Sequence, residues 1–371
     1  MRIAVNTRLL ISGKLDGIGW FSHEVLRRLA RDCPEHEFLF IFDRAFDNEF
    51  LYEENVWAKV LFPQARHPLL YRMYFEYSVP KALKQWRADL FFSPDGFLST
   101  RTTIPQIPVI HDINFEHRPE DLPKSYANYY RDYFPRFAKK AKRILTVSEY
   151  SANDIAETYK IDRGLIHVAH NGYNESYRPL APEDISKSRD LYAKGKPYFI
   201  FVGNFSFRKN VHGIVSAYDK YRSSGGEHKL LLVGNPLWRY AEMDEALSQS
   251  PFAEDIVFKG HLSIDELTKA MGGATALLFP SYFEGFGIPI IESFAAGIPV
   301  ICSNLTALPE VAGEAALYCS PDDHDQMAAH MRSIEMESSL RESLIEAGKN
   351  QLQKFSWDQT ANKVKQTLFH V

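Results

Sequence analysis

Two glutamates and two glycines follow a short apolar run late in the chain. The segment reads Ser281-Tyr-Phe-Glu284-Gly-Phe-Gly-Ile-Pro-Ile-Ile-Glu292, and its proline suits the first turn of a helix. Glu284 then lies in the loop before that helix, and Glu292 lies about one turn inside it. Backbone N–H groups at Gly285 and Gly287, with the helix dipole, attract anions. Carboxylates accept hydrogen bonds from vicinal hydroxyls, so the pattern predicts a ribose or hexose site. An acidic loop followed by a helix-surface residue is the alternative.

Two adjacent cations follow another apolar run, residues 198–202. The sequence there is Gly203-Asn-Phe-Ser-Phe-Arg208-Lys209-Asn210, followed by a helical pattern. Such a pair suits a diphosphate, because arginine offers a planar fork and lysine a compact charge. The segment lacks the Gly-Lys-Ser/Thr of a Walker loop. A solvated basic turn is the alternative.

Two further patterns occur in the first half of the chain. His111 and Asp112 follow an apolar pair. A histidine there can donate a hydrogen bond to a sugar hydroxyl or to a developing charge, with Asp112 orienting the ring or meeting an acceptor. A histidine satisfied by local backbone is the alternative. Gly17 and Gly19 precede a helical pattern and would let the backbone approach a phosphate or sugar. A plain turn is the alternative. The segment is not a dinucleotide fingerprint, because the third glycine is missing.

Short apolar runs rich in β-formers alternate with helical patterns, which is typical of parallel sheets flanked by helices. The predicted strands form two series: residues 3–5, 38–42, 90–92, 109–111, 144–147 and 166–168, then 198–202, 229–233, 256–258, 276–279 and 300–302. The predicted helices span residues 20–31, 69–86, 125–142, 151–159, 211–221, 265–271 and 288–296. Residues 174–197 are polar, contain two prolines and predict an interdomain linker. We therefore predict an α/β fold with two doubly wound, Rossmann-like domains facing a central cleft, and ligands at the carboxyl ends of the strands.

Composition excludes several classes of protein. The chain has 371 residues, 45% of them apolar and 13% aromatic, which excludes a disordered protein and predicts two or three domains. Three cysteines are too few for a disulfide scaffold and indicate a reducing compartment. We find neither a signal-peptide core nor an apolar run of the roughly 18 residues that span a bilayer, and expect a cytoplasmic protein. The net charge of −4 argues against nucleic acid as a partner.

Taken in order, these residues resemble the retaining glycosyltransferases of family 4, which have the GT-B fold. The resemblance covers most of the chain and includes further segments: Thr146-Val-Ser-Glu-Tyr-Ser151, Asn171-Gly172, Gly260-His-Leu, Ala296-Gly-Ile-Pro-Val-Ile-Cys-Ser303-Asn304 and Leu308-Pro-Glu-Val311. It implies an acceptor-binding domain over residues 1–178 and a nucleotide-sugar-binding domain over residues 179–355. It also implies that a helix within residues 356–371 returns to the first domain.

The resemblance implies a role for each motif. Arg208 and Lys209 should bind the donor diphosphate and neutralise the leaving group, and Glu284 should hold hydroxyls of the transferred sugar. Glu292 should take the ribose hydroxyls, and His111 should lie near the anomeric centre. The implied catalytic residues are His111, Asp112, Arg208, Lys209 and Glu284. The implied donor-binding residues are Gly17, Gly19, Gly203, Arg208, Lys209, His261, Leu262, Glu284, Gly285, Phe286, Gly287 and Glu292, with the base near His261 and Leu262.

The resemblance also implies the reaction. The acceptor attacks the same face that the leaving group departs from, so the anomeric configuration is retained without a protein nucleophile. We expect no cofactor and no metal, because the cations and a helix N-terminus supply positive potential. Asp323-His-Asp325 matches the Asp-x-Asp pattern of metal-dependent glycosyltransferases, but its place before a helix predicts an N-cap. The expected donor is GDP-mannose, with UDP-sugars as the alternative. The expected acceptor is a glycan or lipid-linked glycan.

Other functions on the same fold stay open at this point: a sugar-nucleotide epimerase, a glycogen-phosphorylase-like enzyme or a non-catalytic nucleotide-sugar-binding protein. Residues 125–143 also leave a choice, because they carry six Lys/Arg, one acid and six aromatics. Such a helix could rest on anionic lipid. It could instead pack its aromatics on a sheet and leave its cations solvated. We favour packing, with loose peripheral membrane contact through the first domain left open.

Overall fold

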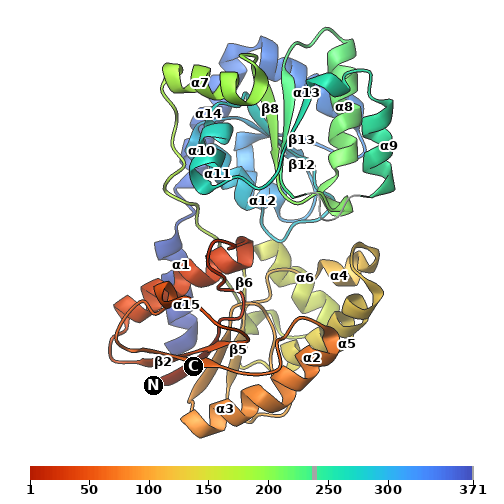
Figure 1. Cartoon of the computed structure of the whole chain (residues 1–371). Helices are drawn as coiled ribbons and strands as arrows, with labels where there is room; N and C mark the ends of the chain where they lie inside the picture. Colours follow the sequence, from red (N-terminus) through yellow and green to blue (C-terminus); the bar gives the residue numbers. More distant parts are fainter. Residues whose placement is uncertain (236–239, 370–371) are drawn as a thin grey trace. The chain divides into compact units, whose positions relative to one another are not determined.

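The computed structural model describes residues 1–235 and 240–369. The chain divides into two compact units, each built around a parallel sheet (Figure 1). The first unit contains Met1–Gly172 and the C-terminal segment from Ser356, and the second contains Tyr173–Phe355. The chain thus enters the second unit at Tyr173, shortly before the boundary predicted at residue 178. Among the described helices, none is both long and apolar enough to cross a membrane.

The sheet of the first unit has the strand order β3-β2-β1-β4-β5. Its strands are β1 (Arg2–Asn6), β2 (Glu37–Phe42), β3 (Val56–Val60), β4 (Leu90–Ser93) and β5 (Gln106–Pro108). Strands β6 (Ile144–Thr146) and β7 (Ile166–Val168) pair with each other, and Val109 bridges to Leu145. The helices are α1 (Gly17–Asp32), α2 (Pro68–Met73), the π-helical turn η2 (Tyr74–Ser78), α3 (Val79–Trp86), α4 (Asn114–His117), α5 (Lys124–Lys140) and α6 (Glu149–Tyr159). Short 3-10 turns occur at η1 (Asn48–Phe50), η3 (Pro119–Asp121) and η4 (Arg163–Leu165).

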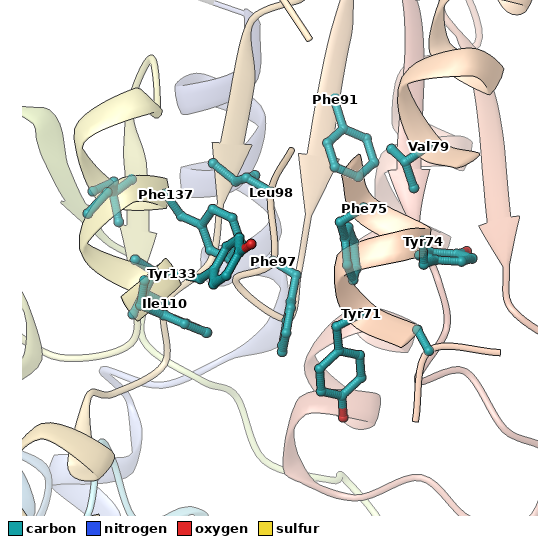
Figure 2. Packing of buried hydrophobic residues seen from close by; sticks show 14 of the residues in the cluster. Tyr71, Tyr74, Phe75, Val79, Phe91, Phe97, Leu98, Ile110, Tyr133 and Phe137 are labelled. Carbon is teal, nitrogen blue, oxygen red and sulfur yellow. The ribbon is translucent and has the colours of Figure 1, made fainter. Parts of the chain in front are cut away.

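An aromatic core joins these helices to the sheet (Figure 2). Tyr71, Phe75 and Val79 recur every four residues along α2, η2 and α3, so one face of this segment is buried. Helix α5 contributes four buried aromatic side chains, which are Tyr129, Tyr133, Phe134 and Phe137. The prediction that the aromatics of this helix pack inward is therefore confirmed.

The last helix, α15 (Trp357–Phe369), belongs to the first unit and packs on α1. Arg28 Nε of α1 lies 2.5 Å from Asp358 Oδ1. Gly172 shows why the approach is close: a Cβ there would lie 2.3 Å from the backbone nitrogen of Trp357. The glycine of the Asn171-Gly172 motif therefore makes room for the returning chain, as the predicted C-terminal helix requires.

The second sheet has the order β10-β9-β8-β11-β12-β13, with all strands parallel. Its strands are β8 (Tyr198–Val202), β9 (Lys229–Val233), β10 (Ile256–Lys259), β11 (Ala276–Phe279), β12 (Val300–Ser303) and β13 (Ala316–Cys319). Helices cover both faces (Figure 1): α7 (Pro182–Ala193), α8 (Val211–Ser223), α9 (Ala241–Gln249), α10 (Ile264–Gly272), α11 (Ile288–Ala296), α12 (Leu308–Ala312), α13 (His324–Met336) and α14 (Ser338–Leu352). This strand order is that of doubly wound nucleotide-binding domains, and the order reverses between β8 and β11.

Three predictions about elements were wrong. Residues 174–197 are not merely a linker, because they contain α7, and the Tyr192 hydroxyl donates to the Glu266 carbonyl at 3.1 Å. Pro182 begins that helix, although the two prolines of this stretch are part of the reason for predicting a linker. The strand predicted at residues 109–111 ends at Pro108. Strands β3 and β13 were also missed; both lie at sheet edges and are partly exposed.

Candidate functional site

The polar side chains of the second unit gather at the carboxyl ends of β8 and β11. These two strands are neighbours, and the order of the sheet reverses between them. In open α/β sheets, ligands bind at this position because the loops diverge there. The loop after β8 carries Arg208 and Lys209 in the 3-10 turn η5 (Phe207–Lys209), and the loop after β11 carries Glu284.

These three side chains form one ionic network. Lys209 Nζ lies 2.5 Å from Glu284 Oε1, and Arg208 Nη1 lies 3.2 Å from Glu284 Oε2. The same Arg208 nitrogen donates to the Phe283 carbonyl at 3.0 Å. Lys209 and Glu284 are buried, whereas the Arg208 side chain is 21% exposed. Two cations therefore contact one carboxylate at the end of the sheet.

The network fixes the protonation state of Glu284. Burial alone would raise the pKa of Glu284, but the adjacent charges of Lys209 and Arg208 outweigh burial and hold that pKa below its usual value. The carboxylate is therefore ionised at neutral pH and can only accept hydrogen bonds. Such a group suits sugar hydroxyls and does not suit the role of a general acid.

Asn210 ties the two loops together. It adopts a left-handed backbone conformation (φ 57°), and its side chain caps α8 by accepting from the Gly213 N–H at 3.1 Å. The amide nitrogen also donates to the carbonyls of Pro280 and Pro321, at 3.1 and 2.8 Å. An asparagine directly before a helix predicts the cap. Its contacts with two distant loops cannot be predicted from the neighbouring sequence, so Asn210 had no predicted role.

Thr306 is a second residue without a predicted role. The Glu284 N–H donates to its hydroxyl at 3.1 Å, and Thr306 itself has a left-handed φ of 56°. The hydroxyl therefore fixes the backbone of the catalytic candidate from the loop after β12. No spacing rule links residues 284 and 306, because the contact depends on β11 and β12 being neighbours.

Residues 285–287 lead into α11. Gly287 has a φ of 105°, which favours glycine, and a Cβ there would lie 2.8 Å from Leu308 Cδ2 and would displace that side chain. Pro289 occupies the first turn of α11, as predicted. The Phe286 side chain is buried with its ring edge-on to Phe355, 5.5 Å between centroids. The Phe286 side chain is thus a packing group, and any role toward a ligand falls to its backbone.

Glu292 differs from Glu284 in its surroundings. It lies in α11, is half-buried and faces the buried hydroxyl of Tyr177. Burial raises the pKa of Glu292 to about 7, while the Tyr177 hydroxyl acts in the opposite direction. None of the described residues brings to Glu292 a cation comparable with Lys209, so burial leaves the pKa of its carboxyl near neutrality. Tyr177 is a further residue that the sequence analysis did not identify.

The first unit positions His111 at the carboxyl end of its own sheet. Its Nε2 lies 2.8 Å from the Pro94 carbonyl, which only accepts, so the proton sits on Nε2. Burial lowers the pKa of His111, so the ring is neutral at pH 7 and Nδ1 is an acceptor. The ring also contacts Phe21 edge-on at 5.1 Å. The alternative of a histidine satisfied by local backbone is therefore correct for Nε2, which is bonded to the Pro94 carbonyl. Asp112 Oδ1 instead accepts from the Asn114 N–H at 3.0 Å.

The glycines at the start of α1 are constrained from within the chain. Asp16 caps the helix, and its Oδ1 accepts from the Gly19 N–H at 3.0 Å. Gly17 is the first residue of the helix. An anion could reach the Gly19 N–H only by displacing the Asp16 side chain.

The remaining candidates lie at other loops. Gly203 follows β8, and Gly234 follows β9; a Cβ on Gly234 would lie 1.8 Å from the Gly203 carbonyl oxygen. His261 and Leu262 follow β10, two strands away from β8 in the sheet, and His261 is exposed. The base contact implied for them stays a prediction.

The Asp-x-Asp segment caps a helix. Asp323 Oδ1 accepts from the Gln326 N–H at 2.9 Å at the start of α13, which confirms the predicted N-cap. Asp325 pairs with Lys220 at 2.6 Å. Within residues 1–235 and 240–369, we find no group of three His, Cys, Asp or Glu side chains placed to hold a metal ion.

Comparison with known proteins identifies both halves of the chain. The family described as Glycosyltransferase Family 4 matches residues 15–177, and the family described as Glycosyl transferases group 1 matches residues 183–351. The O-antigen chain mannosyltransferase B of Escherichia coli is 28% identical over 95% of this chain and 96% of that protein. The O-antigen chain mannosyltransferase RfbU of Salmonella typhimurium is 30% identical over 64% of each chain.

Solved structures share the fold. WaaG, a glycosyltransferase involved in lipopolysaccharide biosynthesis, superposes with a TM-score of 0.79 at 15% identity, over the whole of both chains. Anabaena HepE in complex with UDP-glucose gives 0.77 at 18% identity, also over the whole of both chains. At these identities the likeness concerns the fold of the two units.

Proposed function

Because the chain belongs to glycosyltransferase family 4 and has the GT-B fold, we propose that it transfers mannose from GDP-mannose to a glycan or lipid-linked glycan. The proposed reaction retains the anomeric configuration and needs no metal. The observation that carries the proposal is the network of Arg208, Lys209 and Glu284 at the point where the second sheet reverses its order.

The network supplies what transfer from a nucleotide sugar requires. As the glycosidic bond breaks, negative charge grows on the departing diphosphate, and two cations with one carboxylate between them can stabilise it. Glu284, held ionised, can accept hydrogen bonds from hydroxyls of the sugar being transferred. Both cations are paired with Glu284, so diphosphate binding would rearrange part of this network.

Further residues have proposed roles around this network. Glu292 would accept hydrogen bonds from the ribose hydroxyls, and the backbone near His261 and Leu262 would meet the base. In the first unit, His111 would accept a hydroxyl hydrogen bond at Nδ1, since Nε2 is already committed to Pro94. Also within the first unit, Asp112 would meet the acceptor, and Gly17 and Gly19 would approach the phosphate side of the donor, with Asp16 displaced from the Gly19 N–H.

The identity of the proposed donor is inferred from the similar proteins. Two similar proteins are named O-antigen chain mannosyltransferases, which supports mannose and a glycan acceptor for this chain. A UDP-sugar is the second candidate, because HepE, which shares the fold, was crystallised with UDP-glucose. The structure of the second unit is compatible with either, since the network addresses the diphosphate that both donors contain.

A donor panel tests the proposal. Thermal shift with GDP, GDP-mannose, UDP and UDP-glucose should show the largest stabilisation with the guanine pair. NMR of the sugar released or transferred from GDP-mannose should show retained α configuration.

Addition of a chelator should leave turnover unchanged; loss of turnover restored by magnesium or manganese would contradict metal independence. Conversion of GDP-mannose into an epimeric nucleotide sugar would favour an epimerase, and binding without turnover on any acceptor would favour a non-catalytic role.

A further inference from the structure

An exposed apolar stripe lies on the α2–η2–α3 segment of the first unit. Leu69, Met73 and Tyr77 follow one another at four-residue spacing, so they share one face of this continuous helical segment. Their exposed fractions are 63%, 47% and 61%, and Phe62 in the preceding loop is 72% exposed. Ser78 Oγ donates to the Phe62 carbonyl at 2.5 Å, which holds that loop against the helix. These four apolar residues, Phe62, Leu69, Met73 and Tyr77, are the stripe.

Packing of the fold does not explain the stripe. The opposite face of the same segment carries Tyr71, Phe75 and Val79 into the aromatic core (Figure 2). The segment is therefore already anchored, and polar side chains at the stripe would leave that core unchanged. Large apolar side chains gathered on an exposed face mark a surface that contacts another body.

The exposed charges of this segment have one sign, although the exposed Asp132 of the neighbouring helix α5 pairs with Arg136. Within residues 62–87 the exposed charged side chains are Arg66, Arg72, Lys81, Lys84 and Arg87. The single acid in this range, Glu76, is buried and accepts hydrogen bonds from Thr100. A basic rim around apolar side chains complements an anionic surface with an apolar layer beneath it.

Tyr77 has a second feature of such a surface. The guanidinium of Arg101 lies 4.5 Å from the Tyr77 ring centroid, in a cation–π contact. Tyrosine and arginine each place an apolar body beside a polar tip, which suits the boundary between headgroups and acyl chains. The rim therefore extends to the loop after β4.

We propose that this stripe and its basic rim rest on an anionic lipid bilayer. The inference builds on the lipid-linked acceptor of the proposed function and names the surface through which the first unit would meet it. The contact differs from the one considered from sequence, because α5, which packs beside α2, buries its aromatics. A second copy of the chain is a poorer occupant, since a twofold contact would set each basic rim against itself.

Vesicle co-sedimentation tests the apolar part. The parent should bind vesicles rich in phosphatidylglycerol and bind phosphatidylcholine vesicles much less. The double variant Leu69→Gln/Met73→Gln should bind the anionic vesicles about tenfold or more weakly. The matched control is Leu191→Gln/Met336→Gln in the second unit, whose residues are 63% and 64% exposed. The control should stay within about twofold of the parent. A parent that does not sediment, or equal losses in both variants, would overturn the proposal.

The basic rim is tested separately. Lys81→Gln/Lys84→Gln should weaken binding by about fivefold per lysine removed, and the loss should shrink as salt is raised. Lys194→Gln/Lys196→Gln makes the same charge change in the second unit and should have little effect. Self-association that disappears in Leu69→Gln/Met73→Gln, without vesicle binding by the parent, would assign the stripe to a second copy instead. Donor-induced thermal shifts should be unchanged in every variant, so failure of the lipid contact and failure of the proposed transfer give different results.

Discussion

Each of the two sheets ends in a buried ion pair where its strand order reverses, yet the two pairs differ in their surroundings. In the first unit Arg8 Nε lies 2.5 Å from Asp95 Oδ2, and Asn6 donates to the other carboxylate oxygen at 2.6 Å. The Arg8 guanidinium lies 4.4 Å from the Phe97 ring and donates to the Ala65 carbonyl. One cation meets one carboxylate there, inside a closed aromatic cage.

The second unit places two cations against one carboxylate. Its Arg208 side chain is 21% exposed, against 8% for Arg8. Two cations, one of them with solvent access, can attract an anionic ligand, whereas a single enclosed pair holds loops together. Position at the end of a sheet therefore does not by itself make a functional site. The number of cations that contact the carboxylate and their access to solvent differ between the two units.

The largest expected effect is on stability, at the enclosed pair. Arg8→Ala leaves the Asp95 carboxylate buried without its cation, and breaking such a pair costs about 3–5 kcal/mol. Urea denaturation should show this loss in the free energy of unfolding. Arg8→Ala/Asp95→Ala should recover part of the stability. Normal stability with lost turnover would instead make Arg8 a functional residue and break the contrast between the two units.

Turnover should respond most to the open network. In the proposed reaction Lys209 would interact more strongly with the diphosphate as it leaves, so Lys209→Ala should lower the rate about a hundredfold to a thousandfold, equivalent to about 2.7–4 kcal/mol. Arg208→Ala should act likewise. Single-turnover rates at saturating donor measure this, with thermal denaturation to confirm folding. A folded variant within about threefold of the parent would remove the leaving-group role.

The two glutamates should separate binding from transfer. Glu284→Gln should mainly lower the transfer rate, and Glu292→Gln should mainly weaken nucleotide binding. Each loses a charged hydrogen bond worth about 1.5–3 kcal/mol, so effects of about tenfold to a hundredfold are expected. Titration with free nucleoside diphosphate distinguishes them. Equal losses of diphosphate affinity in both variants would contradict the division of roles.

The smallest effect is a pH dependence at Glu292. The pKa of Glu292 is raised to about 7 by burial, and its ionised form is the better acceptor for ribose hydroxyls. Nucleoside diphosphate affinity should therefore rise between about pH 6 and pH 8, by up to about tenfold, and level off above. Since the ligand phosphate also titrates, Glu292→Gln is the control and should show a flatter profile. Identical profiles in the parent and Glu292→Gln would exclude the carboxyl as the titrating group.

Much of this molecule could be predicted from its sequence, because the decisive signals are local. Buried parallel strands are continuous apolar runs, so Tyr198–Val202, Lys229–Val233 and Ala276–Phe279 were predicted with their observed bounds. Loops after such strands carry the polar motifs, and Gly287 and Pro289 mark a helix start by backbone geometry alone. The edge strands β3 and β13, which are both short and partly exposed, were not predicted.

Tertiary structure decided how those motifs act. The pairing of Lys209 with Glu284 depends on β8 and β11 being neighbours, although 75 residues separate the two side chains. The same is true of Thr306 and Asn210, whose contacts cross between loops. Glu284 and Glu292 are the same residue type eight positions apart. Their different surroundings lower the pKa of Glu284, which stays ionised, and raise the pKa of Glu292 to about 7. Local sequence sets which groups a loop offers; long-range packing sets their charge, partners and access, because these depend on atoms distant along the chain.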